Sequence, residues 1–133
     1  DGNEEKQYDA IEKSTPIFSP DSKRVAYEAV VGDYTIVGKK HLVVVDGKEE
    51  KQYDGIGKDT LIFSPDSKRL AYWAQVGDKQ FVIVDGNEGK QYDDAVIKGS
   101  QIVFDSPNNL HYLAGEGNKI YLVEMAIKSG SSK

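Results

Sequence analysis

The sequence contains no cysteine, a single methionine and only two histidines among its 133 residues. The absence of cysteine excludes disulfide bonds and thiolate metal sites, and it leaves the cellular compartment open. His41 and His111 have no partners at the spacing that a zinc site or a nucleophilic triad needs. We therefore predict no catalytic residues, no metal and no cofactor, and we assign structural roles to both histidines.

An excess of positive charge and long apolar runs are also missing. The net charge is -5 and the pI is about 5.0, whereas nonspecific nucleic-acid binding requires a basic face. The longest apolar runs, such as residues 42–45, are far shorter than the roughly 20 residues that span a bilayer. We expect a soluble protein with no nucleic-acid partner and no membrane insertion, in the periplasm, the cytoplasm or outside the cell.

Two sequence motifs recur along the chain. The turn motif, Phe-Ser-Pro-Asp-Ser-Lys-Arg at residues 18–24, returns unchanged at 63–69 and in altered form at 104–110. The outer motif at residues 1–9 is matched at 46–54 and 85–93, so its offsets are 45 residues (46 − 1) and 39 residues (85 − 46). Periods of about 40–45 residues are typical of propeller blades or helical arrays.

The local pattern favours strands over helices in every unit. Apolar residues alternate or form runs of four, with turn signals every 8–12 residues or so. The only segments that could form a helical turn are Ala10–Ser14 and Asp94–Lys98. Each unit is expected to contain four strands, which are an outer strand (Lys6–Asp9, Lys51–Asp54, Lys90–Asp93), an apolar strand (Thr15–Phe18, Thr60–Phe63, Gln101–Phe104), a third strand (Arg24–Val30, Arg69–Val76, Leu110–Ala114) and a fourth strand (His41–Val45, Gln80–Val84, Ile120–Glu124).

The turn motif is expected to close a hairpin between the apolar strand and the third strand. Proline presets φ for a tight turn, and Asp and Ser side chains bond the local backbone. Turn stabilisation explains Asp21, Ser22, Asp66 and Ser67 better than calcium binding, because the alternating acidic ligands of a calcium loop are missing.

Four strands per unit of about 40 residues, together with the turn motif, resemble the WD-like propeller repeat of TolB-like proteins. They also resemble the repeats of the regulatory propellers of prolyl oligopeptidase relatives. Those families end the turn in Asp-Gly, where this chain has Asp21-Ser22 and Asp66-Ser67. The resemblance implies an all-β fold of three four-stranded antiparallel blades, with the apolar strand nearest the axis, and it implies no reaction. The blades cover about residues 1–45, 46–84 and 85–126, and residues 127–133 form a tail.

Three blades are too few for a closed propeller, which usually has four to eight. We expect two large uncovered apolar faces, a first strand without a partner, and a last blade without its outer strand. These features predict a six-bladed ring made by two chains head to tail. In it, Lys6, Gln7 and Tyr8 complete the partner's last blade beside Tyr121 and Val123. The alternative is that these are three blades of a longer propeller chain.

Residues that differ between the units are the candidates for binding a partner, because the shared residues serve the common scaffold. Tyr27 to Asp46 spans 19 steps and Tyr72 to Asp85 spans 13, so the first unit has six extra residues (19 − 13). This insertion is either a contact surface or a packed strand extension. Trp73 replaces Glu28 and Leu113 of the other units. The candidate binding residues are Tyr34, Ile36, Val37, Trp73 and the rim lysines Lys13, Lys58 and Lys98.

The sequence therefore predicts a non-enzymatic scaffold for protein–protein interaction that assembles with itself through its blade faces. Its partners would be a second copy and, in addition, another protein or peptide. One alternative is a propeller that binds a carbohydrate or a small polar ligand through Trp73 and tyrosines of the rim. Another is a fragment of a larger propeller associated with a hydrolase.

Overall fold

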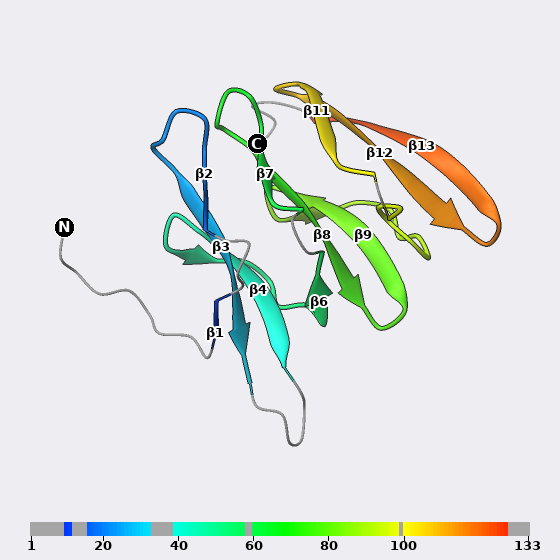
Figure 1. The fold of residues 1–133 in the computed structure, drawn as a ribbon, viewed down its shortest axis with the longest axis horizontal. Coiled ribbons are helices and arrows are strands. Elements are labelled where there is room, and N and C mark those ends of the chain that lie inside the picture. Colours follow the sequence, from blue (N-terminus) through cyan, green and yellow to red (C-terminus); the bar gives the residue numbers. More distant parts are fainter. Residues whose placement is uncertain (1–9, 12–15, 33–38, 58–59, 99, 128–133) are drawn as a thin grey trace.

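The computed structural model describes residues 10–11, 16–32, 39–57, 60–98 and 100–127, and all of its named elements are β-strands. The strands form three antiparallel sheets. In Figure 1 the green second sheet lies between the blue-to-cyan first sheet and the yellow-to-red third sheet. Within the described ranges, no helix is long and apolar enough to cross a membrane.

The first sheet contains β1 (Ala10–Ile11), β2 (Ile17–Phe18), β3 (Val25–Val31), β4 (Lys40–Val45) and β5 (Lys48–Glu49). Its strand order is β1-β3-β4-β5, and β2 pairs with β3 as well. Since β1 and β2 pair with opposite ends of the same strand, they are two pieces of one interrupted edge strand.

The second sheet repeats this plan with β6 (Gly55–Ile56), β7 (Ile62–Phe63), β8 (Leu70–Val76), β9 (Lys79–Val84) and β10 (Asn87–Glu88). The third sheet contains β11 (Val103–Ser106), β12 (Asn109–Glu116) and β13 (Lys119–Ala126), in that order. β5 and β10 belong to the outer motif, yet each pairs with the strand before it in the chain. The two outer motifs that the structure describes, at 46–54 and 85–93, therefore complete the sheet of the preceding unit.

The predicted turn chemistry is confirmed in the first two units. Ser19 Oγ donates to Asp21 Oδ1 over 2.6 Å, and that oxygen also accepts the Lys23 amide over 3.0 Å. Ser64, Asp66 and Lys68 repeat the arrangement. Ser22 and Ser67 have φ values of 63° and 66°, in the left-handed region that glycine occupies most easily.

The turns also connect neighbouring sheets. The Asp21 amide donates to Ser67 Oγ over 3.0 Å, and Arg24 donates to the carbonyl oxygens of Ser67 and Lys68 over 3.0 and 2.9 Å. The guanidinium also binds Asp46, which follows its own sheet's fourth strand. The arginine that ends the turn motif therefore joins the first unit to the second.

The outer strands predicted at Lys51–Asp54 and Lys90–Asp93 are wrong in position. The paired residues lie at Lys48–Glu49 and Asn87–Glu88, and the later part contributes single bridges at Tyr53 and Tyr92. The Asp-Gly pairs have positive φ and turn the chain at once, so pairing begins directly after them. Residues 50–53 span three steps opposite the two steps of residues 41–43, so one residue bulges out and ends the regular pairing.

The apolar strand nearest the turn motif also differs from the prediction. Its paired part is only Ile17–Phe18 or Ile62–Phe63, and in the third unit it is shifted to Val103–Ser106 with a register break after Phe104. Ala10–Ile11, for which we expected at most a helical turn, is a strand. The other predicted strands agree within two residues at each end. The predicted strands at Lys6–Asp9 and the start of Thr15–Phe18 lie outside the described residues.

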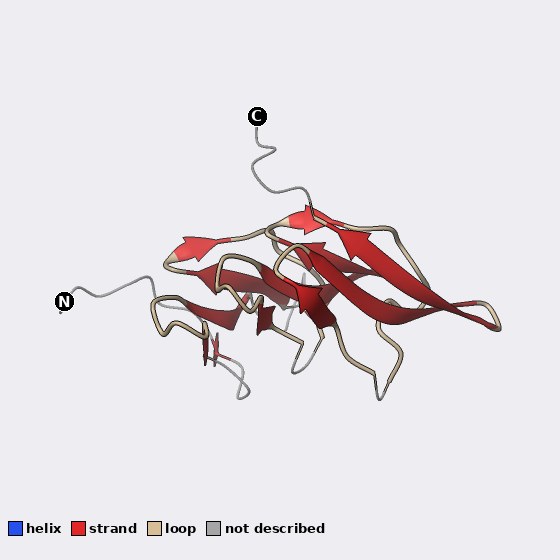
Figure 2. Ribbon diagram, turned by 90° about the horizontal axis from the view of Figure 1, so that it is seen from above, coloured by secondary structure: helices blue, strands red, loops and turns tan. Residues whose placement is uncertain are grey.

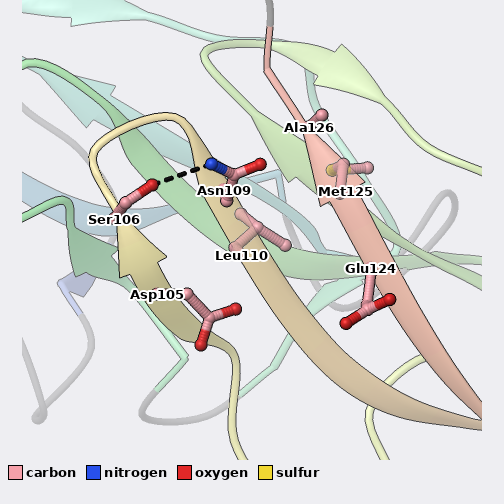
Figure 3. Close-up of a pocket in the computed structure, with 7 residues that line it drawn as sticks. All are labelled: Asp105, Ser106, Asn109, Leu110, Glu124, Met125 and Ala126. Atoms are coloured by element: carbon pink, nitrogen blue, oxygen red, sulfur yellow. Dashed lines mark hydrogen bonds between the residues drawn. The ribbon is translucent and has the colours of Figure 1, made fainter.

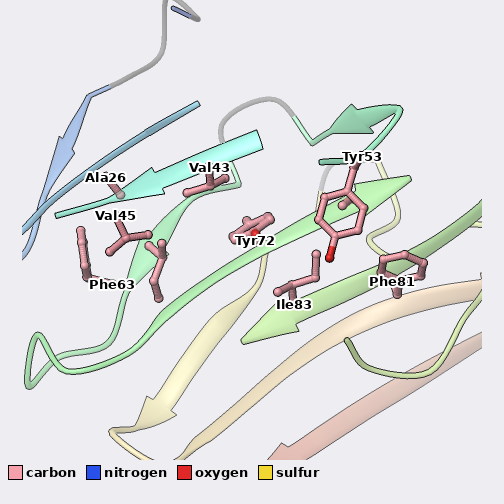
Figure 4. Close-up of a cluster of buried hydrophobic side chains, with 10 residues drawn as sticks. Ala26, Val43, Val45, Tyr53, Phe63, Tyr72, Phe81 and Ile83 are labelled. Atoms are coloured by element: carbon pink, nitrogen blue, oxygen red, sulfur yellow. The ribbon is translucent and has the colours of Figure 1, made fainter. Parts of the chain in front are cut away.

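The sheets stack face to face, because two buried clusters fill the spaces between them. The turned view of Figure 2 shows that the described secondary structure consists of strands joined by loops. At the first interface, between the first and second sheets, Ala26, Val43 and Val45 face Tyr72 and Ile83 (Figure 4). The second interface, between the second and third sheets, holds Ala71, Val82, Tyr92, Leu110 and Tyr112. Four tyrosines at recurring positions of the repeat, Tyr53, Tyr72, Tyr92 and Tyr112, are buried in these clusters.

The two end faces of the stack differ, contrary to the expectation that both are bare. On the first sheet, Ala29, Leu42 and Val44 point away from the second sheet and are nevertheless at most 1 % exposed. Phe18 of the same sheet is 65 % exposed, whereas its counterpart Phe63 is 7 % exposed. The prediction of an uncovered apolar face is therefore wrong at Ala29, Leu42 and Val44, which are buried within a single chain, whereas Phe18 is exposed.

Candidate assembly surface and ligand pocket

The outer face of the third sheet is the largest departure from the repeat in burial. Leu113 and Leu122 lie opposite one another on β12 and β13, at the place that the pair Trp73 and Val82 takes in the second sheet. Leu122 is 61 % exposed and Val82 is fully buried. The third sheet covers Val82, but no described sheet covers Leu122, so the Leu122 side chain is exposed to solvent.

Two further side chains, Ile120 and Val103, extend this exposed area. Because side chains alternate between the faces of a strand, Ile120 and Leu122 share one face of β13. Ile120 is 70 % exposed, and Val103 on β11 is 38 % exposed. We call Val103, Leu113, Ile120 and Leu122 the distal patch. Exposed neighbouring apolar side chains of this kind mark interaction surfaces in soluble proteins.

The end of the same face near the turn motif is polar. His111 donates to Asp105 over 2.8 Å and lies opposite Glu124. The equivalent opposed pair in the second sheet is Ala71 and Val84, which are buried and apolar. Asp105 and Glu124 line a hollow of about 450 Å³ (Figure 3). The face thus combines an apolar half with an acidic half.

The outer edge of β13 differs from the matching edges of the first two sheets. β4 is paired with β5 and bridged by Tyr53, and β9 is paired with β10 and bridged by Tyr92. Within the described part of the chain, no strand pairs with that edge of β13. An edge with unpaired backbone groups is a template for another strand.

Polar groups at the first interface show how the outer motif fastens neighbouring sheets. The Tyr72 hydroxyl donates to Glu50 over 2.6 Å, and the Tyr53 hydroxyl donates to Glu88 over 2.9 Å. Burial, reinforced by Glu50, raises the pKa of Tyr72 above its ordinary value. Lys51 and Tyr53 together lower the pKa of Glu88. Both carboxylates therefore accept a tyrosine hydroxyl from the neighbouring sheet.

A separate pocket of about 330 Å³ brings together two residues predicted as ligand contacts, Trp73 and Lys98. Trp73 is half-buried on β8, and Lys98 lies in the segment that precedes β11. The whole lining consists of Gly57, Thr60, Trp73, Asp94, Val96, Ile97, Lys98 and Ser100. Asp94 was not predicted from the sequence as a site residue. Asp94 directly follows the outer motif, and the matching residues of the other units, Ala10 and Gly55, are not polar.

The other predicted site residues have mixed outcomes. Tyr121 and Val123 face the second sheet, with the Tyr121 ring 6.3 Å from that of Tyr92. Their side chains therefore serve an internal interface, and the outward positions of β13 are Ile120, Leu122 and Glu124, which alternation in this strand could have indicated. The predicted residues Lys6, Gln7, Tyr8, Lys13, Tyr34, Ile36, Val37 and Lys58 lie outside the described residues.

Comparison of the chain with family models, with curated proteins and with solved structures gave no match. The resemblance to propeller repeats therefore rests on the residues of the repeat alone.

Proposed function

We propose that this chain is a non-enzymatic, propeller-like scaffold module that assembles with a second copy of itself through the third sheet. The observation that carries the proposal is the exposure of Leu122, which is 61 % exposed while its counterparts Val43 and Val82 are fully buried. Inside the chain, the neighbour that covers such a position is always the next sheet of the same repeat. The best-matched cover for the distal patch is therefore another copy.

The uncovered edge of β13 supports the same partner. The segments that cover the equivalent edges of β4 and β9 are the outer motifs at 46–54 and 85–93. Residues 1–9 carry the same motif, differing from 46–54 only at position 3. We propose that residues 1–9 of one copy pair with β13 of the other, because both internal examples place this motif on such an edge.

The part of the second copy that meets the third sheet at the end near the turn motif, beside the distal patch, is proposed to include Phe18. Phe63, its counterpart, is 7 % exposed and lies beneath Arg24 of the preceding sheet, with the guanidinium carbon 5.4 Å from the ring centre. Phe18 is 65 % exposed. A second copy that brought Phe18 against the third sheet would bury two apolar surfaces that a single chain leaves in water.

The acidic half of the third sheet, around Asp105 and Glu124, limits how the contact can form. Buried without cationic partners, these carboxylates would oppose association. The contact is therefore proposed to centre on the distal patch and the β13 edge and to leave the acidic hollow at its rim. That rim, and the insertion containing Tyr34, Ile36 and Val37, are the proposed places for a further protein or peptide partner.

Light scattering after size-exclusion chromatography tests the assembly. We expect a mass of about twice the chain mass of 14.7 kDa at micromolar concentration. Leu122→Lys should shift the mass to that of one chain. Val76→Lys is the matched control, since Val76 is also exposed, at 46 %, but lies at the hairpin end of the second sheet. This control should stay dimeric.

A folded single chain at every concentration would contradict the proposed assembly and return the alternative of a piece of a longer propeller. Circular dichroism of Leu122→Lys separates loss of assembly from loss of folding, because Leu122 points away from the second sheet. Deletion of residues 1–9 tests the edge separately from the face. If the deletion left the dimer intact, the proposed strand pairing would be wrong.

A further inference from the structure

The pocket around Trp73 lies within one chain and does not depend on assembly. It is formed by residues that flank β6 and β7, by β8, and by the segment before β11, so both the second and the third sheet contribute to it. Its volume of about 330 Å³ is at the lower end of the range of small-molecule sites. The hydrogen-bonding groups on its wall determine which class of ligand it fits.

The two hydroxyl groups of the pocket are already used as donors. Thr60 Oγ1 donates to the Gly57 carbonyl oxygen over 2.7 Å and accepts the Trp73 amide over 3.3 Å. Ser100 Oγ donates to the carbonyl oxygen of Ile97. A hydroxyl has one proton and two lone pairs. Both side chains therefore offer only acceptor capacity to a ligand.

Two opposite charges complete the wall. Among the described residues, no hydrogen bond or ion pair engages the Asp94 carboxylate or the Lys98 ammonium, although Asp94 is half-buried. The carboxylate adds acceptors and the ammonium adds donors. Because the two charges cancel, the pocket offers no net attraction to an anion or a cation. It favours a neutral ligand with many hydroxyl donors and at least one acceptor.

Trp73 supplies a fixed apolar surface. A Cβ atom on Gly57 would lie 2.8 Å from Cδ2 and Cε2 of the indole, so the absence of a side chain at residue 57 lets the ring pack against the backbone. The indole is half-buried and lines the pocket. An aromatic surface beside polar groups suits a ligand with apolar C–H groups and polar hydroxyls.

We propose that this pocket binds a neutral pyranose sugar, with Asp94, Thr60 and Ser100 accepting hydroxyl protons, Lys98 donating to a sugar oxygen, and Trp73 contacting the C–H groups of the ring. The same pyranose could come as a free monosaccharide or as the end of a glycan. The two sources differ at the anomeric oxygen, which carries a proton in the free sugar and a carbon in the glycan.

Trp73 is the only tryptophan in the chain, so its fluorescence reports on the pocket directly. Titration with glucose, galactose, mannose and N-acetylglucosamine should give a saturable change for at least one sugar, with a Kd on the order of 1 mM. The methyl glycoside of that sugar distinguishes the sources. Tighter or equal binding of the glycoside indicates a glycan end, and loss of binding indicates a free sugar.

Substitutions at the two charged residues sharpen the test. Asp94→Asn keeps the volume and removes the charged acceptor, so affinity should fall about tenfold. Lys98→Met should lower it several-fold. Asp78→Asn, on the exposed β8–β9 hairpin, is the matched control and should bind like the unchanged chain. Thermal unfolding of each variant excludes misfolding as the cause of a lost signal.

The proposal is overturned if no pyranose gives a saturable change, or if Asp94→Asn binds as tightly as the unchanged chain. Choline and arginine serve as cationic probes. A saturable response to either of them, without one to any sugar, would assign the pocket to a cation instead. Either result leaves the light-scattering mass unaffected, so it is distinct from a failure of the proposed assembly.

Discussion

At the first interface, hydroxyl groups and a guanidinium reach from one sheet to carboxylates and carbonyls of the next, whereas the second interface is mainly apolar. Glu50 accepts the Tyr72 hydroxyl at the first interface, but the equivalent residue at the second is Gly89. The Tyr112 hydroxyl, the counterpart of Tyr72, is buried with no hydrogen-bond partner among the described residues. Burial, with a smaller effect of Tyr92, raises its pKa to about 12.

The difference shows that polar cross-links are not needed to stack these sheets. A Cβ on Gly89 would lie 3.0 Å from Cε of Met125, so the methionine occupies the space beside Gly89. Leu110, Tyr112 and Ala114 remain as deeply buried as Leu70, Tyr72 and Ala74. Apolar packing is therefore common to both interfaces, and the polar links are additions to the first.

The largest expected difference in the free energy of unfolding is between two variants that each remove one tyrosine hydroxyl, one at each interface. Tyr72→Phe leaves the Glu50 carboxylate half-buried without its donor, and we expect a loss of about 1.5–3 kcal/mol in the free energy of unfolding. Tyr112→Phe removes a hydroxyl that has no partner, so it should be neutral or slightly stabilising. Urea unfolding of the two variants measures both values. Equal losses would contradict the contrast between the interfaces.

The next largest difference in stability is expected between substitutions of the two turn-motif arginines, Arg24 and Arg69. Arg24 reaches two backbone carbonyls of the next unit, whereas the link from Arg69 to the next unit is to Asn108, over 3.2 Å. Arg24→Met, which keeps the apolar stem, should cost about 1–2 kcal/mol, and Arg69→Met about half as much. The same denaturation experiment compares them. A larger loss for Arg69→Met would show that its ion pair with Asp85 outweighs the links between units.

The two serines with positive φ are expected to respond in opposite directions. Ser22→Gly relieves backbone strain at an exposed position and should stabilise the chain by about 0.5–1 kcal/mol. Ser67→Gly relieves the same strain but loses the hydrogen bond from the Asp21 amide, at a side chain that is 3 % exposed. We expect a net loss of about 0.5–1 kcal/mol. Stabilisation by both glycines would mean that the bond between the turns contributes nothing.

The smallest effect is expected in acid, at Glu88. Lys51 and Tyr53 lower its pKa in the folded chain, so its contribution to stability is present above its ordinary pKa of 4.5 and is lost as pH falls below that value. Glu88→Gln should therefore flatten the dependence of the unfolding midpoint on pH between about 5 and 3. The pKa values of Asp54 and Asp93 are also lowered, and these residues occupy equivalent places at the two interfaces. Their effect on the pH dependence should be the same in the unchanged chain and in Glu88→Gln.

The sequence predicted the strands well where side chains alternate and poorly where pairing depends on backbone detail. The long hairpins of β3 with β4 and β8 with β9 follow directly from apolar periodicity. The position of β5 depends on a bulge after Glu50, and the strand at Ala10–Ile11 depends on a neighbouring strand that offers free backbone groups. Neither cause leaves a local signal in the residues concerned.

The candidate site was predictable only in part, for the same reason. Trp73 was identified because it differs between units, and Lys98 because it was expected on the rim, but Asp94 joins them only through the approach of two sheets. Tyr121 and Val123 were chosen from the strand without knowledge of its facing. The register of β12 with β13 places Leu122 outward and turns the neighbouring side chains inward.

The repeated motifs alone determined that the chain forms antiparallel strands and that Ser-Pro-Asp-Ser turns connect two of these strands within a sheet. The reason is that turn chemistry and side-chain alternation act between near neighbours in the sequence. Only the tertiary structure decided which faces are covered. Phe18 and Phe63 have identical neighbours in the turn motif but differ from 65 % to 7 % in exposure, since burial depends on whether another sheet lies above the side chain.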